Sequence, residues 1–310
     1  MPEIKLCDLI EKMKTPKALI ESDVLEYKRK ISDVASLVCA DGSVRVILLA
    51  GPSGSGKTTT ANLLSDEIKR LGEPSMVISL DDFYLDAADS RYPRAADGSR
   101  DFESPYALDT ELLLKTLSDI VAGREFSVPK YGFKVGGRVG VTKYPSISDG
   151  CVIIEGIHGL NPIFSDPFPK DKVKRLFVSV STNIEDEGRI ILSGRKLRFV
   201  RRMVRDSLYR DADARRTIGM WQNVLAGEDE HLYPFKELAD VRINTFHTFE
   251  PAVMKPYAMK LLTPDVREES EYANIVASAL MRLPDIHDSL VPEDSLIREF
   301  IPGGIYEHLY

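Results

Sequence analysis

Hydrophobic positions divide the chain into short apolar runs separated by stretches with helical spacing. Continuous apolar runs occupy residues 44–50, 75–80, 151–155, 175–180 and 241–244. Runs of this kind are typical of strands that are buried on both faces, and helices between such strands favour parallel pairing. We therefore expect an α/β fold in which a parallel sheet of about five strands is flanked by helices.

The segments on either side of this alternation have a different pattern. Residues 1–42 carry apolar residues at helical spacing, which predicts a helical N-terminal extension. The sheet and its helices are expected to form a core at 43–257. Residues 258–310 mix helix and loop patterns, so we expect a C-terminal appendage there.

Turn residues and periodicity place further elements within the core. Helices are expected at 57–71 and 107–121, and the polar stretch 86–104 is expected to be an exposed loop. Glycines within 128–138 indicate a hairpin or flap. An arginine-dense block at 185–232 reads as a helical insertion between the last two strands.

Residues 51–58 fit the phosphate-binding pattern G-x-x-x-x-G-K-[ST] and lie between an apolar run and a helical pattern. Glycines let successive backbone N–H groups face an anion at a helix N-terminus. Lys57 can then reach the β- and γ-phosphates, and the Thr58 hydroxyl can ligate magnesium. The pattern predicts a nucleoside triphosphate site in a P-loop NTPase-type fold. The residues expected to bind the nucleotide are Gly51, Ser53, Gly54, Ser55, Gly56, Lys57, Thr58 and Thr59.

Two carboxylates end strands of the expected sheet, at the edge where open α/β sheets bind ligands. Asp81 follows the second strand and is a candidate to accept the proton of an acceptor hydroxyl and to help hold magnesium. Glu155 ends the third strand and is a candidate magnesium ligand, directly or through water. The alternative for Asp81 is a turn carboxylate or a helix N-cap, and the alternative for Glu155 is a helix-capping glutamate.

Four arginines, Arg198, Arg201, Arg202 and Arg205, fall on one face of an expected helix. Their guanidinium groups repel one another unless an anion lies nearby, and a migrating γ-phosphate is such an anion. We expect this stripe to belong to a lid over the phosphate. A solvated surface and an RNA contact are the alternatives.

Composition narrows the classes of partner. The formal net charge of −7 argues against a dedicated nucleic-acid binder. Cys7, Cys39 and Cys151 form no C-x-x-C pair and are expected to be reduced thiols. No apolar run approaches the roughly 18 residues of a membrane span, and the N-terminus does not resemble a signal peptide. We expect a cytoplasmic protein without nucleic-acid or membrane partners, for which a homo-oligomer is possible.

Together these residues resemble the uridine kinase (uridine–cytidine kinase) family, within the group that includes phosphoribulokinase and pantothenate kinase. The resemblance covers about 44–304 and rests on residues 51–58, 80–84, 101–109, 128–133, 154–157 and 201–206. The segments around Trp221 and at 295–300 resemble a longer bacterial-type subgroup of this family.

The resemblance implies phosphorylation of the 5′-hydroxyl of uridine, with cytidine as a second acceptor, by ATP and Mg²⁺ in pyrimidine salvage. It implies catalytic roles for Asp81, Lys57, Arg202 and Arg205, and a metal site formed by Thr58, Asp81 and Glu155. The residues that it places beside the nucleoside are Tyr84, Phe102, Glu103, Tyr131 and Arg201, and Phe133 is a further aromatic residue in the same loops.

Some positions depart from the family's pattern. Gly132 replaces an aspartate, and the histidine that usually follows is absent, with Lys134 and Arg138 nearby. Glu103 replaces a shorter aspartate, and the lid's usual Arg-Gly-Arg is replaced at 210–213. These changes leave open a related kinase that acts on another small alcohol, such as a sugar or a modified nucleoside. A nucleotide-dependent switch without kinase chemistry is the second alternative, against which Asp81, Glu155 and the arginines argue.

Overall fold

The computed structural model describes the chain except for residues 1, 95–97, 99, 133–134, 148 and 310. The strands are β1 (Glu3–Lys5), β2 (Val46–Ala50), β3 (Ser75–Ser79), β4 (Phe126–Gly132), β5 (Gly137–Tyr144), β6 (Cys151–Glu155), β7 (Val173–Ser179), β8 (Asn183–Asp186), β9 (Arg189–Leu192) and β10 (Val241–Asn244). The helices are α1 (Leu6–Met13), α2 (Pro16–Ala40), α3 (Lys57–Arg70), α4 (Thr110–Val121), α5 (Pro162–Ser165), α6 (Gly194–Tyr209), α7 (Ala214–His231), α8 (Glu250–Leu261), α9 (Pro264–Glu269) and α10 (Glu271–Leu280).

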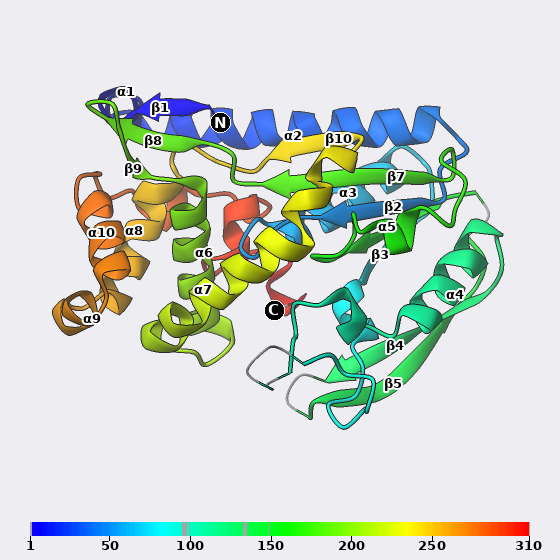
Figure 1. Ribbon diagram of the computed structural model, residues 1–310. Coiled ribbons are helices and arrows are strands. Elements are labelled where there is room, and N and C mark those ends of the chain that lie inside the picture. The colour runs from blue at the N-terminus through cyan, green and yellow to red at the C-terminus, as the bar shows by residue number, and fades with distance from the viewer. Residues whose placement is uncertain (1, 95–97, 99, 133–134, 148, 310) are drawn as a thin grey trace.

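A five-stranded sheet in the order β10-β7-β2-β6-β3 forms the centre of the fold, and its neighbouring strands pair in parallel. Every residue of β2 and of β6 is buried, as their continuous apolar sequences require. Figure 1 shows α2 lying along the sheet, with α4 and the β4–β5 hairpin beyond its other side. The expected α/β fold with a parallel sheet of about five strands flanked by helices is confirmed.

Alternate residues of β2 enter two separate hydrophobic cores. Ile47 and Leu49 belong to a large cluster that includes side chains of α2 and α3. Val46 and Leu48 belong to a second cluster, with side chains of α4 and β4. Because side chains alternate along a strand, one apolar run supplies both layers.

The N-terminal extension is helical but begins with a strand that was not expected. β1 pairs in parallel with β8 in a separate sheet of order β1-β8-β9. The arginine-dense block therefore opens with the β8–β9 hairpin, and the expectation of helix throughout it was wrong at this end. Glu187 and Gly188 both have positive φ, 48° and 76°, which suits a two-residue hairpin turn.

The remaining predicted elements are present with small shifts. β4 and β5 form the expected antiparallel hairpin. The helix expected from 107 begins at Thr110, because the Asp109 side chain accepts a hydrogen bond from the Leu112 N–H and caps it. Over the part of the chain that the structure describes, no helix combines the length and the apolar character needed to cross a bilayer.

Candidate functional site

The phosphate loop joins β2 to α3, and its glycines are required by geometry. A Cβ on Gly51 would lie 2.3 Å from the carbonyl oxygen of Val178. Gly56 caps α3 with φ of 90°, a conformation that other residues rarely adopt. The loop thus presents its backbone at the N-terminus of a 14-residue helix, which is a favourable position for an anion.

A cavity of about 190 Å³ opens beside this loop, at the carboxyl edge of the sheet. Among the residues that line it are the loop members Ser53, Gly54, Gly56, Lys57 and Thr58, the carboxylates Asp81, Glu103, Glu155 and Glu299, and the arginines Arg202, Arg205 and Arg210. Gly51, Ser55 and Thr59 are expected nucleotide-binding residues that do not line the cavity, and all three are buried. The cavity therefore combines cationic groups for phosphates with carboxylates for a metal or a proton.

Strand pairing brings the two strand-end carboxylates together. β3 pairs with β6 so that Ser79 lies opposite Glu155, and Asp81 follows two residues after Ser79. The Thr58 hydroxyl lies 3.4 Å from Glu155 Oε1 and donates to it. A hydroxyl and two carboxylates suit Mg²⁺, which prefers oxygen ligands and keeps several waters or phosphate oxygens. Within the described residues, no three acidic, histidine or cysteine side chains form a protein-only metal cluster.

The same surroundings alter the acidity of both carboxyl groups. Loss of hydration raises the pKa of Asp81, while the charges of Lys57 and Arg210 oppose the rise. Loss of hydration also raises the pKa of Glu155 to about 7, against the opposing charge of Lys57 and with a further rise from Asp81. A cation bound beside them would favour the ionised forms of both groups.

The arginine stripe of α6 divides into two pairs. Arg202 and Arg205 line the cavity. Arg202 donates to the Ser53 hydroxyl at 2.8 Å, and Arg205 pairs with Asp206 at 2.8 Å. Arg198 and Arg201 instead point into the protein, where they are 1% and 0% exposed.

The placement of Arg201 corrects the expectation that it binds substrate. Its guanidinium pairs with both carboxylate oxygens of Glu250, at 2.6 and 2.7 Å. It also donates to the backbone carbonyl oxygens of Gly54 and Ser55, at 3.2 and 3.3 Å. Arg201 is thus bound to protein groups and lies outside the lining of the cavity, where it supports the phosphate loop.

Three side chains hold Ser53 at the tip of the loop, and we refer to them as the Ser53 clamp. Glu228 of α7 accepts from the Ser53 N–H, Arg198 donates to the Ser53 carbonyl, and Arg202 donates to its hydroxyl, each at 2.8 Å. Glu228 and Arg198 also form a fully buried ion pair at 2.8 Å. Both helices of the arginine-dense block, α6 and α7, therefore form hydrogen bonds to the phosphate loop.

Sequence reasoning missed Glu228, although a signal was present. Trp221, Val224 and Glu228 recur on one face of α7, and all three are buried. An acidic residue on an apolar helix face is rarely buried without a cationic partner. That spacing could have directed attention to a buried ion pair.

On the acceptor side, Tyr84 and Glu103 line the cavity. Loss of hydration raises the pKa of Glu103 to about 7, and the charge of Arg202 opposes the rise. A Cβ on Gly227 would lie 2.6 Å from the Glu103 side chain, so α7 covers this glutamate closely.

The other aromatic residues lie outside the lining of the cavity. Tyr131 is buried, and its ring centroid lies 5.7 Å from that of Tyr84. Phe102 is 53% exposed, and its ring packs edge-on against Tyr92. Phe133 and Lys134 lie outside the described residues. Arg138, which stands near the altered family positions, pairs with Asp109 at 2.7 Å.

Two charged residues of the cavity lining were not expected there. Arg210 directly follows the C-terminus of α6. It belongs to residues 210–213, where the sequence departs from the family's usual Arg-Gly-Arg. Glu299 comes from a single helical turn, η5 (Leu296–Glu299), more than 140 residues after Glu155. No local pattern connects so distant a residue with the phosphate loop.

The family model and the curated relatives that match this chain point to the same protein family. The model of the phosphoribulokinase / uridine kinase family matches residues 46–250, which is more than half of the chain. The chain is 35% identical to a uridine kinase of Schizosaccharomyces pombe over 171 residues, which cover 55% of this chain and 33% of that protein. It is 27% identical to a uridine kinase of Staphylococcus aureus over 199 residues, which cover 64% and 86% of the two chains.

Among solved structures, a Silicibacter protein described as a fructose transport system kinase superposes with a TM-score of 0.50 at 19% identity. The superposition covers 69% of this chain and 98% of that one, and it supports the fold alone. The chain spans about a third of the length of the fission yeast relative.

Proposed function

The chain belongs to the phosphoribulokinase / uridine kinase family, a group of phosphotransferases, and from this premise we propose that it transfers the terminal phosphoryl group of ATP to the 5′-hydroxyl of uridine. Cytidine is the second acceptor of the proposal, and pyrimidine salvage is its setting. One observation carries it: Lys57 and Asp81 line the same cavity, so a phosphate-binding cation and an acceptor-side carboxylate face one space.

On the donor side, the loop and the first turn of α3 hold the triphosphate, and Lys57 neutralises its terminal phosphates. Thr58, Asp81 and Glu155 would hold Mg²⁺, in keeping with their oxygen donors and common cavity. When bound, the metal neutralises charge on the β- and γ-phosphate oxygens. Arg202 and Arg205 face the same space and stabilise the negative charge on the migrating group.

On the acceptor side, Asp81 orients the attacking hydroxyl and accepts its proton. Glu103 accepts hydrogen bonds from neighbouring sugar hydroxyls, and the Tyr84 ring packs against the nucleoside. The positions of Glu103 and Tyr84 in the lining support these roles. Phosphoryl transfer needs little covalent participation from the protein, so orientation and charge supply most of the rate.

A second acceptor class, a small alcohol other than a pyrimidine nucleoside, is favoured by a separate observation. Tyr131 and Phe102 lie outside the cavity lining, and Arg138 is engaged by Asp109. The residues that the family resemblance assigns to the base are therefore not gathered around the cavity.

A substrate panel tests the proposal. Purified protein with ATP and Mg²⁺ is given uridine, cytidine, other nucleosides, sugars and small polyols, and ADP formation and the phosphorylated product are both measured. We expect uridine to be converted to its 5′-monophosphate. Turnover of another alcohol without turnover of uridine would establish the second class instead. ATP binding without phosphorylation of any alcohol would favour the other alternative, a nucleotide-dependent switch without kinase chemistry.

A further inference from the structure

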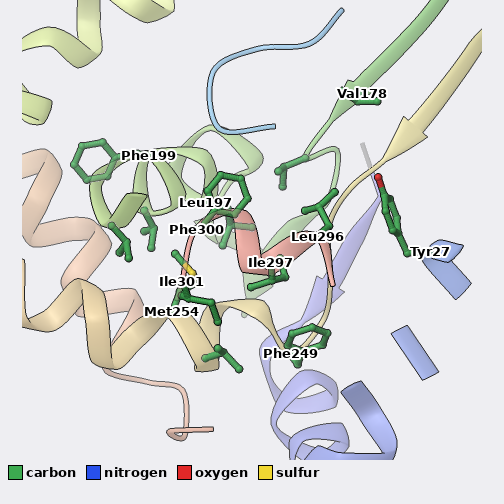
Figure 2. Packing of buried hydrophobic residues seen from close by; sticks show 14 of the residues in the cluster. Tyr27, Val178, Leu197, Phe199, Phe249, Met254, Leu296, Ile297, Phe300 and Ile301 are labelled. Carbon is green, nitrogen blue, oxygen red and sulfur yellow. The ribbon is translucent and has the colours of Figure 1, made fainter. Parts of the chain in front are cut away.

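The chain returns to the phosphate loop after the family-matched residues have ended at 250. Helices α8 to α10 follow the match, and the turn η5 then contacts α3. We call residues 295–301 the returning segment. Figure 2 shows its residues Leu296, Ile297, Phe300 and Ile301 inside the buried cluster, and each is 0% exposed. The returning segment is therefore part of the core of the protein.

The returning segment contacts the phosphate loop and its supports. A Cβ on Gly56 would lie 2.8 Å from Leu296, so this leucine packs directly beneath the loop's last glycine. The Phe300 ring lies 5.0 Å below the guanidinium of Arg201, which holds two loop carbonyls. The phosphate loop and Arg201 therefore pack against Leu296 and Phe300, which lie outside the residues matched by the family model.

Glu299 is the charged member of the returning segment and is 4% exposed. Its Oε2 accepts a hydrogen bond from the Thr59 backbone N–H at 3.3 Å, in the first turn of α3. Its Oε1 lies 3.9 Å from a guanidinium nitrogen of Arg205. One buried carboxylate thus joins the loop helix to the lid arginine that faces the cavity.

The two carboxylates beside Arg205 have different effects on its position. Asp206 is its neighbour on α6 and can only fix the guanidinium relative to that helix. Glu299 is held by α3, so it alone of these two fixes the guanidinium relative to the phosphate loop. Small displacements of a group that binds a transferring phosphate reduce rates strongly.

We propose that Glu299 is a positioning residue for phosphoryl transfer, which holds Arg205 at its working place over the phosphate loop. This inference rests on the proposed function, since it assigns Arg205 to the terminal phosphate. The returning segment then belongs to the working site, although it lies outside the family-matched residues.

Glu299→Gln separates the two contacts of this side chain. The amide oxygen can still accept from the Thr59 N–H, whereas the attraction to Arg205 loses its charge. Glu293→Gln is the matched control, because Glu293 is exposed, lies outside the cavity lining and carries the same charge a few residues away. Arg205→Ala and the double variant complete a cycle.

We expect Glu299→Gln to lower kcat by about 10-fold or more while the KM for ATP changes by less than about threefold. Because Glu299 acts through Arg205, the double variant should turn over no more slowly than Arg205→Ala alone. The control should match the unaltered protein, and Tm should show that each variant is folded. An unchanged kcat in Glu299→Gln, or additive losses in the double variant, would overturn the inference.

A measurement without acceptor keeps this inference separate from the proposed function. Calorimetric titrations of the four proteins of the cycle, without the Glu293→Gln control, are made with ATP and with ADP and report how far the terminal phosphate is recognised. We expect Glu299→Gln to reduce the preference for ATP over ADP by about fivefold when Arg205 is present, and by less than about twofold in the Arg205→Ala background. Equal losses in both backgrounds refute the positioning role even if no alcohol is ever phosphorylated. Tighter ATP binding with unchanged kcat would show instead that the carboxylate competes with phosphate.

Discussion

Asp81 and Asp82 are adjacent carboxylates with separate surroundings. Asp81 lines the cavity beside Lys57, whereas Asp82 accepts a hydrogen bond from the Tyr131 N–H at 3.2 Å and lies 3.9 Å from Lys130. We expect Asp81→Asn to lower kcat by about 10²–10⁴-fold, because the amide cannot accept the hydroxyl proton. The KM for ATP should change little. Asp82→Asn is the control and should retain turnover within about threefold in the same ADP-release assay. Near-normal turnover of Asp81→Asn would remove it from the reaction.

The Glu103 carboxyl gives a pH dependence of stability with a definite sign. Loss of hydration raises its pKa from the ordinary 4.5 to about 7. Between these values the unfolded chain releases the proton more readily, so folding stability falls with rising pH by at most about 3 kcal/mol. Glu103→Gln should therefore exceed the unaltered protein in Tm at pH 8 and approach it near pH 4.5. A constant difference in Tm across this range would contradict the assignment.

Among the elements, α7 is expected to stabilise the phosphate loop through the Ser53 clamp. Glu228→Gln leaves the Arg198 charge buried without its partner, which typically costs about 3–5 kcal/mol. We expect a lower urea midpoint and a higher KM for ATP, because Arg198, which donates to the Ser53 carbonyl, loses its charged partner. The neighbouring Asp229→Asn is the control. Asp229 pairs with Arg195 at the surface, where such pairs contribute less than about 1 kcal/mol. Equal effects of the two changes would argue against the clamp.

Sequence patterns predicted the elements unevenly, and the reasons are physical. β2 and β6 were expected because strands buried on both faces must be apolar throughout. β1 was missed because Glu3–Lys5 is short and its pattern is exposed, intermediate, exposed. Helical structure in the arginine-dense block was expected, but not its division into α6 and α7. The β8–β9 hairpin at its start was also missed, because two four-residue strands joined by a two-residue turn leave only a weak pattern.

The residues of the candidate site were also predicted unevenly, because some follow from local motifs and others depend on distant partners. The phosphate loop, Asp81 and Glu155 follow from local motifs at strand ends, and Thr58, Asp81 and Glu155 do line one cavity. The separation of Arg201 from Arg202 could not be predicted, because their orientations depend on Glu250 and on Ser53, which lie far away in sequence. The contribution of Glu299 depends on how the chain returns after α10, which no periodicity reveals.

At the scale of the whole molecule, α2 connects the phosphate-loop helix to later parts of the chain. The Tyr27 hydroxyl is 2.7 Å from the Thr60 hydroxyl, Asp23 accepts hydrogen bonds from Thr248, and Lys28 pairs with Asp294. We propose that the N-terminal extension, the core and the C-terminal appendage unfold as one cooperative body.

Two alanine substitutions in α2 test this cooperativity. Ile20 is 0% exposed, so Ile20→Ala should lower the free energy of unfolding by about 2–5 kcal/mol. Leu25 is 70% exposed, so Leu25→Ala should change it by less than about 0.5 kcal/mol. The chain's one tryptophan, Trp221, lies in α7, so its fluorescence follows a distant region. Coincident shifts of the fluorescence and circular dichroism midpoints are expected in urea. A shift confined to circular dichroism would show that α2 unfolds separately.

The burial of the returning segment also has a consequence for biosynthesis. Residues 296–301 are translated after α3 and α6, against which they pack. Until they emerge from the ribosome, the apolar surface beneath the phosphate loop has no cover, and such surface promotes aggregation. A nascent chain that stalls before residue 296 would therefore have its sheet and its lid but an uncovered loop. We expect ATP binding to appear only after residues 296–301 have emerged, and chains terminated before them to be substrates for chaperones and proteases.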